Sequence, residues 1–292
     1  MINKLKSLHR CQHAILSILA LSFMLFLVFP VAQGQDLYDF DHSKLYARHL
    51  MRSKKFDLAA DEYQRLVFTA PKNDTFRIQL LKAYRLGHNG APGISQWQLW
   101  RLNNDVLSQA VNEEYAKILL TSGKESDAII FAATPENLSF PANSQIALYG
   151  YALLQDWENT DKVINTWPSS APLPYRNALT QLSASGKKIP HKSPAIAAAL
   201  SAIVPGAGKA YTKNWADGAI GLVFVGLNTW QAWRRFDREG SDSIWGWFHG
   251  GLAAGFYIGN IYGSHKAARI FNQYQKHLIR HEAERIIFPA LD

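Results

Sequence analysis

Side chains with the spacing of a reactive site are few in this 292-residue chain. His277 and His281 stand four positions apart, a spacing at which a helix places two imidazoles on one side of a metal ion. The sequence fixes no third ligand near them, so we expect no metal site. Ser201 lacks the glycine-flanked turn of a serine hydrolase, and no histidine–aspartate pair is placed beside it. The sequence therefore indicates neither an enzyme nor a cofactor.

Two ionisable residues lie within apolar stretches. His249 is a functional candidate, because an ionisable group at membrane depth is costly. It stands only about one helical turn from Trp245 and Trp247, however, where a hydrogen-bonded histidine at a membrane interface is expected. Asp217 falls in the first turn of a predicted helix, where a carboxylate is stabilised by free N–H groups. We favour these structural roles, with an intramembrane polar site formed by His249 and Asp217 as the alternative.

The most compact motif of the chain is Pro205-Gly206-x-Gly208-x-x-Tyr211. It follows an apolar run at residues 195–204, which would form about 15 Å of helix, or half a bilayer. Pro205 and Gly206 interrupt this run, so the segment is either a re-entrant helix or a broken spanning helix. Gly206 and Gly208 have no side chains, which lets a neighbouring helix approach their backbone.

This region resembles an uncharacterised family of bacterial membrane domains. The family has a basic residue and a proline, then an Ala/Leu/Ser-rich run, then P-G-x-G-x-x-Y ahead of two apolar spans. The matching residues are Lys192, Pro194, Ser201, Pro205, Gly206, Gly208 and Tyr211. Lys209 stands where the family usually has glutamine. The resemblance covers about residues 190–275 and implies a membrane architecture without adding a reaction, since the family has no established activity.

Two apolar segments follow the motif, at residues 215–233 and 243–263. Tryptophans stand at both ends of the first, about 22–27 Å apart along a helix, which is close to the hydrocarbon thickness of a bilayer. In the second, glycines recur at every fourth position, namely Gly251, Gly255, Gly259 and Gly263. Such a stripe permits close helix packing. We therefore expect a tight transmembrane hairpin in a membrane domain at 195–263, with a homodimer through the same stripe as a further candidate.

Residues 1–34 follow the pattern of a secretory signal peptide. A basic segment is followed by an apolar run at 14–31 and by small residues at 32 and 34. The run is also long enough to remain as an uncleaved anchor, and we favour cleavage. In either case the domain that follows is expected to be exported. The single cysteine, Cys11, lies in this leader, which excludes a disulfide framework.

Residues 36–186 have the pattern of paired helices. Phe56, the small residue Ala59, Tyr63 and a closing Pro71 resemble one tetratricopeptide repeat, whose period is 34 residues. The predicted turns at 56, 91, 125 and 157 keep about that period. An irregular helical domain is the alternative.

The resemblance to tetratricopeptide proteins implies a binding role. Such arrays form a curved surface whose concave face binds peptide segments of partners. Trp97 and Trp100 are candidates for the lining of that groove, with packing in the core as the alternative. The resemblance therefore implies a protein partner for residues 36–186.

The net charge of +8 is modest and fits attraction to anionic lipid. Because no basic stripe with interleaved aromatics is present in the sequence, we expect no nucleic-acid partner. A linker at 187–194 and a basic helical tail at 264–292 complete the domain plan.

We thus expect an all-α protein, with a tetratricopeptide-like solenoid followed by a transmembrane helical hairpin and its preceding broken or re-entrant helix. The expected function is that of a non-enzymatic envelope protein at the bacterial inner membrane, whose periplasmic repeats bind a protein partner. The alternative is a membrane-active module, such as a small transporter, channel or lipid-binding component, in which the repeats are regulatory.

Overall fold

The computed structural model describes residues 39–291, and the predicted signal peptide at 1–34 lies outside them. Within 39–291 the chain is all-helical and contains no strand, as predicted. The first nine helices are α2 (Phe40–Arg52), α3 (Phe56–Thr69), α4 (Asp74–Leu86), α5 (Gly90–Leu102), α6 (Gln109–Thr121), α7 (Glu125–Ala133), α8 (Ala142–Leu153), α9 (Trp157–Thr166) and α10 (Arg176–Gly186). The remaining elements are α11 (Pro194–Ile203), α12 (Ala207–Tyr211), α13 (Trp215–Glu239), η1 (Gly240–Asp242), α14 (Ile244–Ile287) and η2 (Phe288–Leu291).

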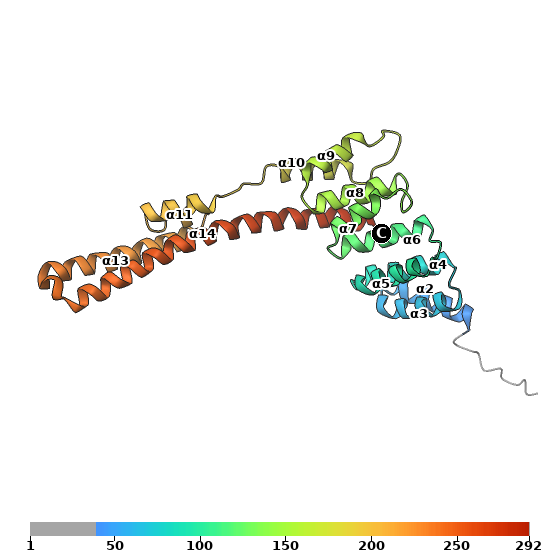
Figure 1. Ribbon diagram of the computed structural model, residues 1–292, viewed down its shortest axis with the longest axis horizontal. Coiled ribbons are helices and arrows are strands. Elements are labelled where there is room, and N and C mark those ends of the chain that lie inside the picture. The colour runs from blue at the N-terminus through green and yellow to red at the C-terminus, as the bar shows by residue number, and fades with distance from the viewer. Residues whose placement is uncertain (1–38, 292) are drawn as a thin grey trace, which may run out of the picture.

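Helices α2 to α10 are short and pack in consecutive pairs, which is consistent with a helical repeat (Figure 1). Several begin at side chains that accept hydrogen bonds from free backbone N–H groups. Asn73 accepts from the N–H groups of Thr75 and Phe76 at the start of α4, and Asp156 accepts from Asn159 at the start of α9. Local capping thus sets the boundaries of these helices, and the apolar faces between them form one core.

The last helix, α14, joins the two ends of the molecule. It runs for 44 residues, which is about 66 Å of helix. Figure 1 shows that its first half forms a hairpin with α13, while its last turns enter the space between α7 and α8. There Ile287 is 0% exposed and Leu291 is 2% exposed. Both belong to the core between the short helices α2 to α10. We call these helices, with the end of α14, the repeat domain, because their pairing is consistent with a helical repeat.

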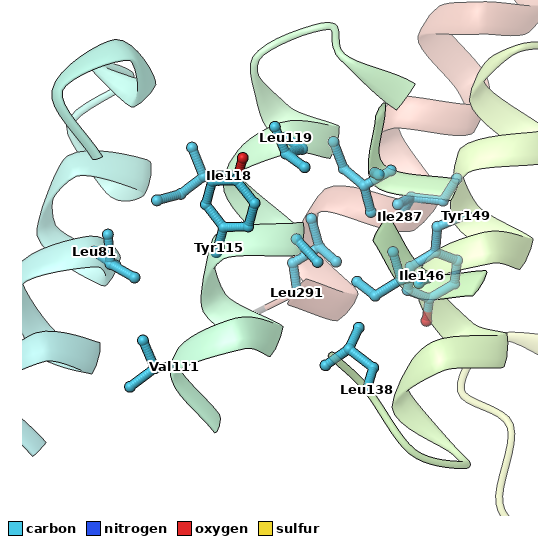
Figure 2. Close-up of a cluster of buried hydrophobic side chains, with 14 of the residues drawn as sticks. Leu81, Val111, Tyr115, Ile118, Leu119, Leu138, Ile146, Tyr149, Ile287 and Leu291 are labelled. Atoms are coloured by element: carbon cyan, nitrogen blue, oxygen red, sulfur yellow. The ribbon is translucent and has the colours of Figure 1, made fainter. Parts of the chain in front are cut away.

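The predicted basic helical tail at 264–292 continues α14, and its end lies in this core, which the sequence did not predict. Figure 2 shows Leu291 and Ile287 among side chains of the repeat helices, including Tyr115 from α6 and Ile146 from α8. Ile279, Ala283, Ile286 and Ile287 share one face of α14 because they recur at three- and four-residue spacing. His281 and Arg285 lie between them and are exposed, while Arg280 reaches the buried Glu125 of α7. These charged and polar residues mask the apolar stripe in the composition of the segment. The tail is therefore a structural part of the repeat domain.

The hairpin consists of α13 and α14, with α11 and α12 packed against them (Figure 1). Ser243 begins α14 by accepting a hydrogen bond from Gly246 N at 3.1 Å. Among residues 39–291, no helix combines the length and the apolar character needed to cross a membrane. The predicted transmembrane spans at 215–233 and 243–263 are therefore wrong. Polar residues such as Asn228 and Asn260, together with many glycines, lower the hydropathy of both helices.

Candidate functional site

The glycine motif at 205–211 is a joint between helices. Gly206 has a φ of +91°, and a Cβ there would lie 2.0 Å from the carbonyl oxygen of Gly218 on α13. A Cβ at Gly208 would lie 1.8 Å from the carbonyl oxygen of Ala197 on α11. Only glycine fits either position, because an L side chain disfavours the first conformation and both contacts are with backbone. The motif thus brings α11, α12 and α13 into backbone contact.

Hydrogen bonds of serine hydroxyl groups add to the contact between these helices. The buried Ser201 and Ser264 share a hydrogen bond of 2.6 Å between their Oγ atoms, and Gly208 N donates to Ser201 Oγ at 3.0 Å. The ring of Tyr211 lies under the ammonium group of Lys192, 4.3 Å from the ring centre. Pro205 follows the end of α11 and is half-buried. These contacts connect α11, α12 and α14, and Ser201 is 0% exposed between them.

Beside the joint lies a pocket of about 380 Å³, which we call the hairpin pocket. Its lining comes from α12, α13 and α14, and consists of Lys209, Asp217, Ile220, Gly221, Phe224, Gly255, Phe256, Gly259 and Asn260. The rings of Phe224 and Phe256 are 5.3 Å apart between centres. Within residues 39–291, neither Lys209 nor Asp217 belongs to an ion pair. The lining of the pocket therefore combines apolar side chains with one cationic group, Lys209, and one anionic group, Asp217.

Asn260 is the unusual residue of this pocket. It is 4% exposed, and neither its amide nitrogen nor its amide oxygen has a hydrogen-bond partner within the described part of the chain. A buried polar group without a partner costs about 1–3 kcal/mol. Gly221 makes room for it, because a Cβ at that position would lie 2.3 Å from Asn260 Nδ2. Asn260 was not among the residues predicted from the sequence, although an asparagine within a glycine-rich apolar helix is a signal that points to it.

The glycine stripe of α14 lies partly along the same pocket. A Cβ at Gly251, Gly255 or Gly259 would meet no heavy atom of the described chain within 4 Å. The expected packing of these three glycines against the preceding helix is therefore wrong, and a homodimer through them stays a prediction. At Gly263 a Cβ would lie 3.4 Å from Lys209 Cε, in ordinary contact. The close approaches of the hairpin occur at other glycines, such as Gly246 beneath Phe236.

His249 and Asp217 do not form one site. Nδ1 of the half-buried His249 lies 3.0 Å from Asn228 Oδ1, within hydrogen-bond distance. Asn228 is eleven residues along α13 from Asp217, or about 16 Å of helix. Asp217 lies in the first turn of α13, as expected, and is exposed at the hairpin pocket. The structure therefore separates the two polar groups that we considered together.

In the repeat domain, the two candidate groove residues belong to the packing. Trp100 is 4% exposed, with the guanidinium carbon of Arg77 5.0 Å from its ring centre. Trp97 stacks on Tyr115 at 4.0 Å between ring centres, and its Nε1 donates to Asn112 Oδ1 at 3.0 Å. Trp100 therefore cannot line an accessible groove, and Trp97 is held by its neighbours.

Two buried arginines of α4 form ion pairs with α6 and with the loop before it, and these pairs were not predicted from the sequence. Arg85 Nε donates to Glu114 Oε1 at 2.6 Å, and both side chains are buried. Arg77 pairs with Asp74 at 3.5 Å and also with Asp105 on the loop before α6. The pairs with Asp105 and Glu114 join residues 28 or 29 positions apart. Because breaking one partner leaves a buried charge uncompensated, such pairs hold α4 and α6 in a fixed arrangement.

The described chain gives no indication of a metal centre. Within residues 39–291, no group of three or more histidine, cysteine, aspartate or glutamate side chains is arranged to hold a metal ion. His277 and His281 are both exposed on α14. No protein-family model matches the chain, and no curated protein or solved structure shows a significant similarity to it.

Proposed function

We propose that this protein is a non-enzymatic adaptor, in which a tetratricopeptide-like repeat domain that binds a protein partner is held at a lipid bilayer by the apolar hairpin. The observation that carries the proposal is the placement of α14. One end of this helix is buried in the repeat core, and the other forms a hairpin covered with exposed apolar side chains. The two parts therefore cannot reorient freely, and the repeats stand at a fixed distance from whatever the hairpin binds.

The distribution of apolar residues favours lipid as the surroundings of the hairpin. The exposed large apolar residues of α13 are Trp215, Ile220, Leu222, Val223, Phe224, Leu227, Trp230 and Trp233. At 100° per residue they occupy an arc of about 200°, whereas a single docked helix needs a stripe of about 100°. Lipid chains would cover the whole arc. Because no described helix crosses a membrane, the proposal is for insertion of apolar surface into the bilayer, without a crossing.

The ends of the hairpin fit such an insertion. Trp215 stands at one end of the apolar zone of α13, and Trp233 stands near the other, both exposed. Tryptophan favours the level of the lipid head groups. Arg234 and Arg235 follow directly, and Lys213 precedes α13, so cationic groups flank the apolar zone. Anionic lipids would attract them.

The first repeat offers the surface for a protein partner. Terminal repeats of helical arrays usually present a polar outer face. Here Leu45 on α2 is 62% exposed, and Leu58 and Phe68 on α3 are 50% and 88% exposed. Phe68 also lines a shallow pocket of about 500 Å³. Exposed apolar side chains on the first described pair of helices are groups that a peptide segment of a partner would cover. The leader-like residues 1–34 favour the periplasmic face of a bacterial inner membrane as the location.

A matched pair of variants tests the binding role. Phe68→Glu places a charge on the proposed surface, and Ile130→Glu places one on α7, where Ile130 is 69% exposed. Both proteins would be cross-linked in native membranes and purified beside the unmodified chain. We expect one protein to co-purify with the unmodified chain and with Ile130→Glu, and to be lost with Phe68→Glu. Equal recovery with both variants would overturn the assignment of this surface.

A further inference from the structure

The hairpin pocket has the features of a built ligand site. It contains Asn260, which is 4% exposed and has no partner for its amide within residues 39–291. A carboxamide offers donors and an acceptor, so a ligand with polar atoms of both kinds would satisfy it. Asn260 belongs to the lining of the pocket, and its amide atoms are buried against Gly221 on α13. A ligand that entered beside Gly221 would supply the hydrogen bonds that the described chain does not.

Glycines keep the pocket open. Gly255 and Gly259 line it, and a Cβ at either would meet no heavy atom of the described chain within 4 Å. Contact with another helix of the described chain therefore does not require glycine at either position. Glycine in a helix interior costs about 0.5–1 kcal/mol relative to alanine. Gly251 is equally open but does not line the pocket, so it is the position of Gly255 and Gly259 in the lining that leaves room there for a bound molecule.

The remaining lining divides into an apolar wall and a charged end. Phe224 and Phe256 form the wall together with Ile220, and the ring centres of the two phenylalanines are 5.3 Å apart. Lys209 and Asp217 contribute one charge of each sign. A ligand with a single charge would meet repulsion from one of them. A head group that carries both an anion and an ammonium group would complement both.

From these contacts we propose that the hairpin pocket binds a zwitterionic amphiphile, with its chain along Phe224 and Phe256 and its head group between Lys209 and Asp217. The anionic group would bind Lys209, the ammonium group would bind Asp217, and the polar atoms between them would bind Asn260. This inference deepens the proposed function. It rests on the proposed function in one respect only, namely that the ligand comes from lipid.

Three probes separate the chemical features of the ligand. Lysophosphatidylethanolamine carries an anion, an ammonium group and one acyl chain. Lysophosphatidic acid with the same chain lacks the ammonium group, and phosphoethanolamine lacks the chain. Native mass spectrometry of the full-length protein released from detergent would measure the occupancy by each probe. We expect the highest occupancy with lysophosphatidylethanolamine, several-fold lower occupancy with lysophosphatidic acid, and none with phosphoethanolamine. Equal occupancy by the first two would overturn the zwitterionic head group, and binding of phosphoethanolamine alone would overturn the amphiphile.

Variants locate the binding. Gly255→Leu fills the pocket, and Gly251→Leu adds the same group on the same helix outside the pocket lining. Neither position has a heavy atom of the described chain within 4 Å of a Cβ, so both variants should fold. We expect Gly255→Leu to abolish the adduct and Gly251→Leu to retain it. Asn260→Leu should weaken binding about tenfold, the size expected for the loss of one or two hydrogen bonds.

The charge contacts have their own test. Asp217→Asn should remove the preference for lysophosphatidylethanolamine over lysophosphatidic acid, because the ammonium group loses its partner. Unchanged binding by Gly255→Leu would overturn the pocket. Vesicle flotation of the same variants keeps this inference distinct from the proposed function. Loss of the adduct with unchanged flotation supports ligand binding in the pocket as an event distinct from bilayer association, although Ile220 and Phe224 contribute to both. An unmodified protein that carries the adduct but does not float would contradict the bilayer association alone.

Discussion

The guanidinium group of Arg280, near the C-terminal end of α14, pairs with the carboxylate of Glu125 at the start of α7, 155 residues earlier in the chain. Glu125 is 4% exposed. Arg280 also donates to Glu284 at 2.9 Å and to the carbonyl oxygen of Leu153 at 3.3 Å. These contacts fix the long helix to the repeat domain. Burial opposes the charged guanidinium, but hydrogen bonds from Arg280 to Glu284 and Glu125 leave its pKa raised.

Removing this pair should destabilise the repeat domain. Arg280→Met leaves Glu125 buried without a partner, which should lower the free energy of unfolding by about 3 kcal/mol. Arg285→Met is the control, because the pair of Arg285 with Glu282 is exposed and should contribute about 0–1 kcal/mol. Urea unfolding followed by circular dichroism measures both. Equal losses would show that Arg280 does not hold the helix in place.

The burial of the C-terminal turns gives a second prediction. Ile287→Ala leaves a cavity in the repeat core and should cost about 2–5 kcal/mol. Leu278→Ala on the same helix, where Leu278 is 48% exposed, should stay within about 0.5 kcal/mol of the parent. Thermal unfolding of the two variants side by side decides whether η2 and the end of α14 belong to the core.

The glycine joint predicts a sharp difference between two alanine substitutions. Gly206→Ala introduces a Cβ that would lie 2.0 Å from the carbonyl oxygen of Gly218, at a φ of +91°. It should cost at least about 2 kcal/mol. Gly226→Ala should instead stabilise α13 by about 0.5–1 kcal/mol, because no heavy atom of the described chain lies within 4 Å of that Cβ. Similar unfolding midpoints for the two variants would contradict the joint.

Acid should loosen the contact between α9 and α10. Burial raises the pKa of Asp161, but hydrogen bonds from Lys187 and Ser183 outweigh it, so that the pKa lies below its ordinary value. A lowered carboxylate pKa contributes stability above the unfolded-state pKa, and this stability is lost as pH falls through the folded-state pKa. Because both side chains of the ion pair are more than a third exposed, the contribution is at most about 1 kcal/mol. Asp161→Asn should therefore flatten the pH dependence of stability below about pH 4.

Local pattern predicted much of the repeat domain. The small residue Ala59 and the aromatic Tyr63 were read as packing between paired helices, and both are buried. Capping residues and turns are local in sequence, so helix boundaries follow from them. The burial of Ile287 was missed because its partners lie more than a hundred residues away. No local period reports a contact of that range.

The hairpin of α13 and α14 shows a different limit of prediction from sequence. The composition of 215–233 and 243–263 predicted two apolar helices, and α13 and α14 cover these segments. The tryptophans and glycines also suggested crossings, although polar residues and glycines lower the hydropathy of both helices below what a crossing needs. The pocket was missed because Asn260 and Asp217 lie on different helices. The pocket is visible only in the structure, which brings the unpartnered amide of Asn260 into the same lining as the charged groups of Lys209 and Asp217.

The most direct test of the account is contact between the hairpin and lipid. Cys11→Ala removes the single cysteine, and Leu227→Cys then carries a fluorescent label on α13, where Leu227 is 56% exposed. Leu45→Cys gives a label on the repeat domain, where Leu45 is 62% exposed. In vesicles of phosphatidylethanolamine and phosphatidylglycerol with brominated chains, we predict that bromine strongly quenches the fluorescence of the label at position 227. We predict no quenching of the label at position 45. Equal quenching at both positions, or none at 227, would contradict the account.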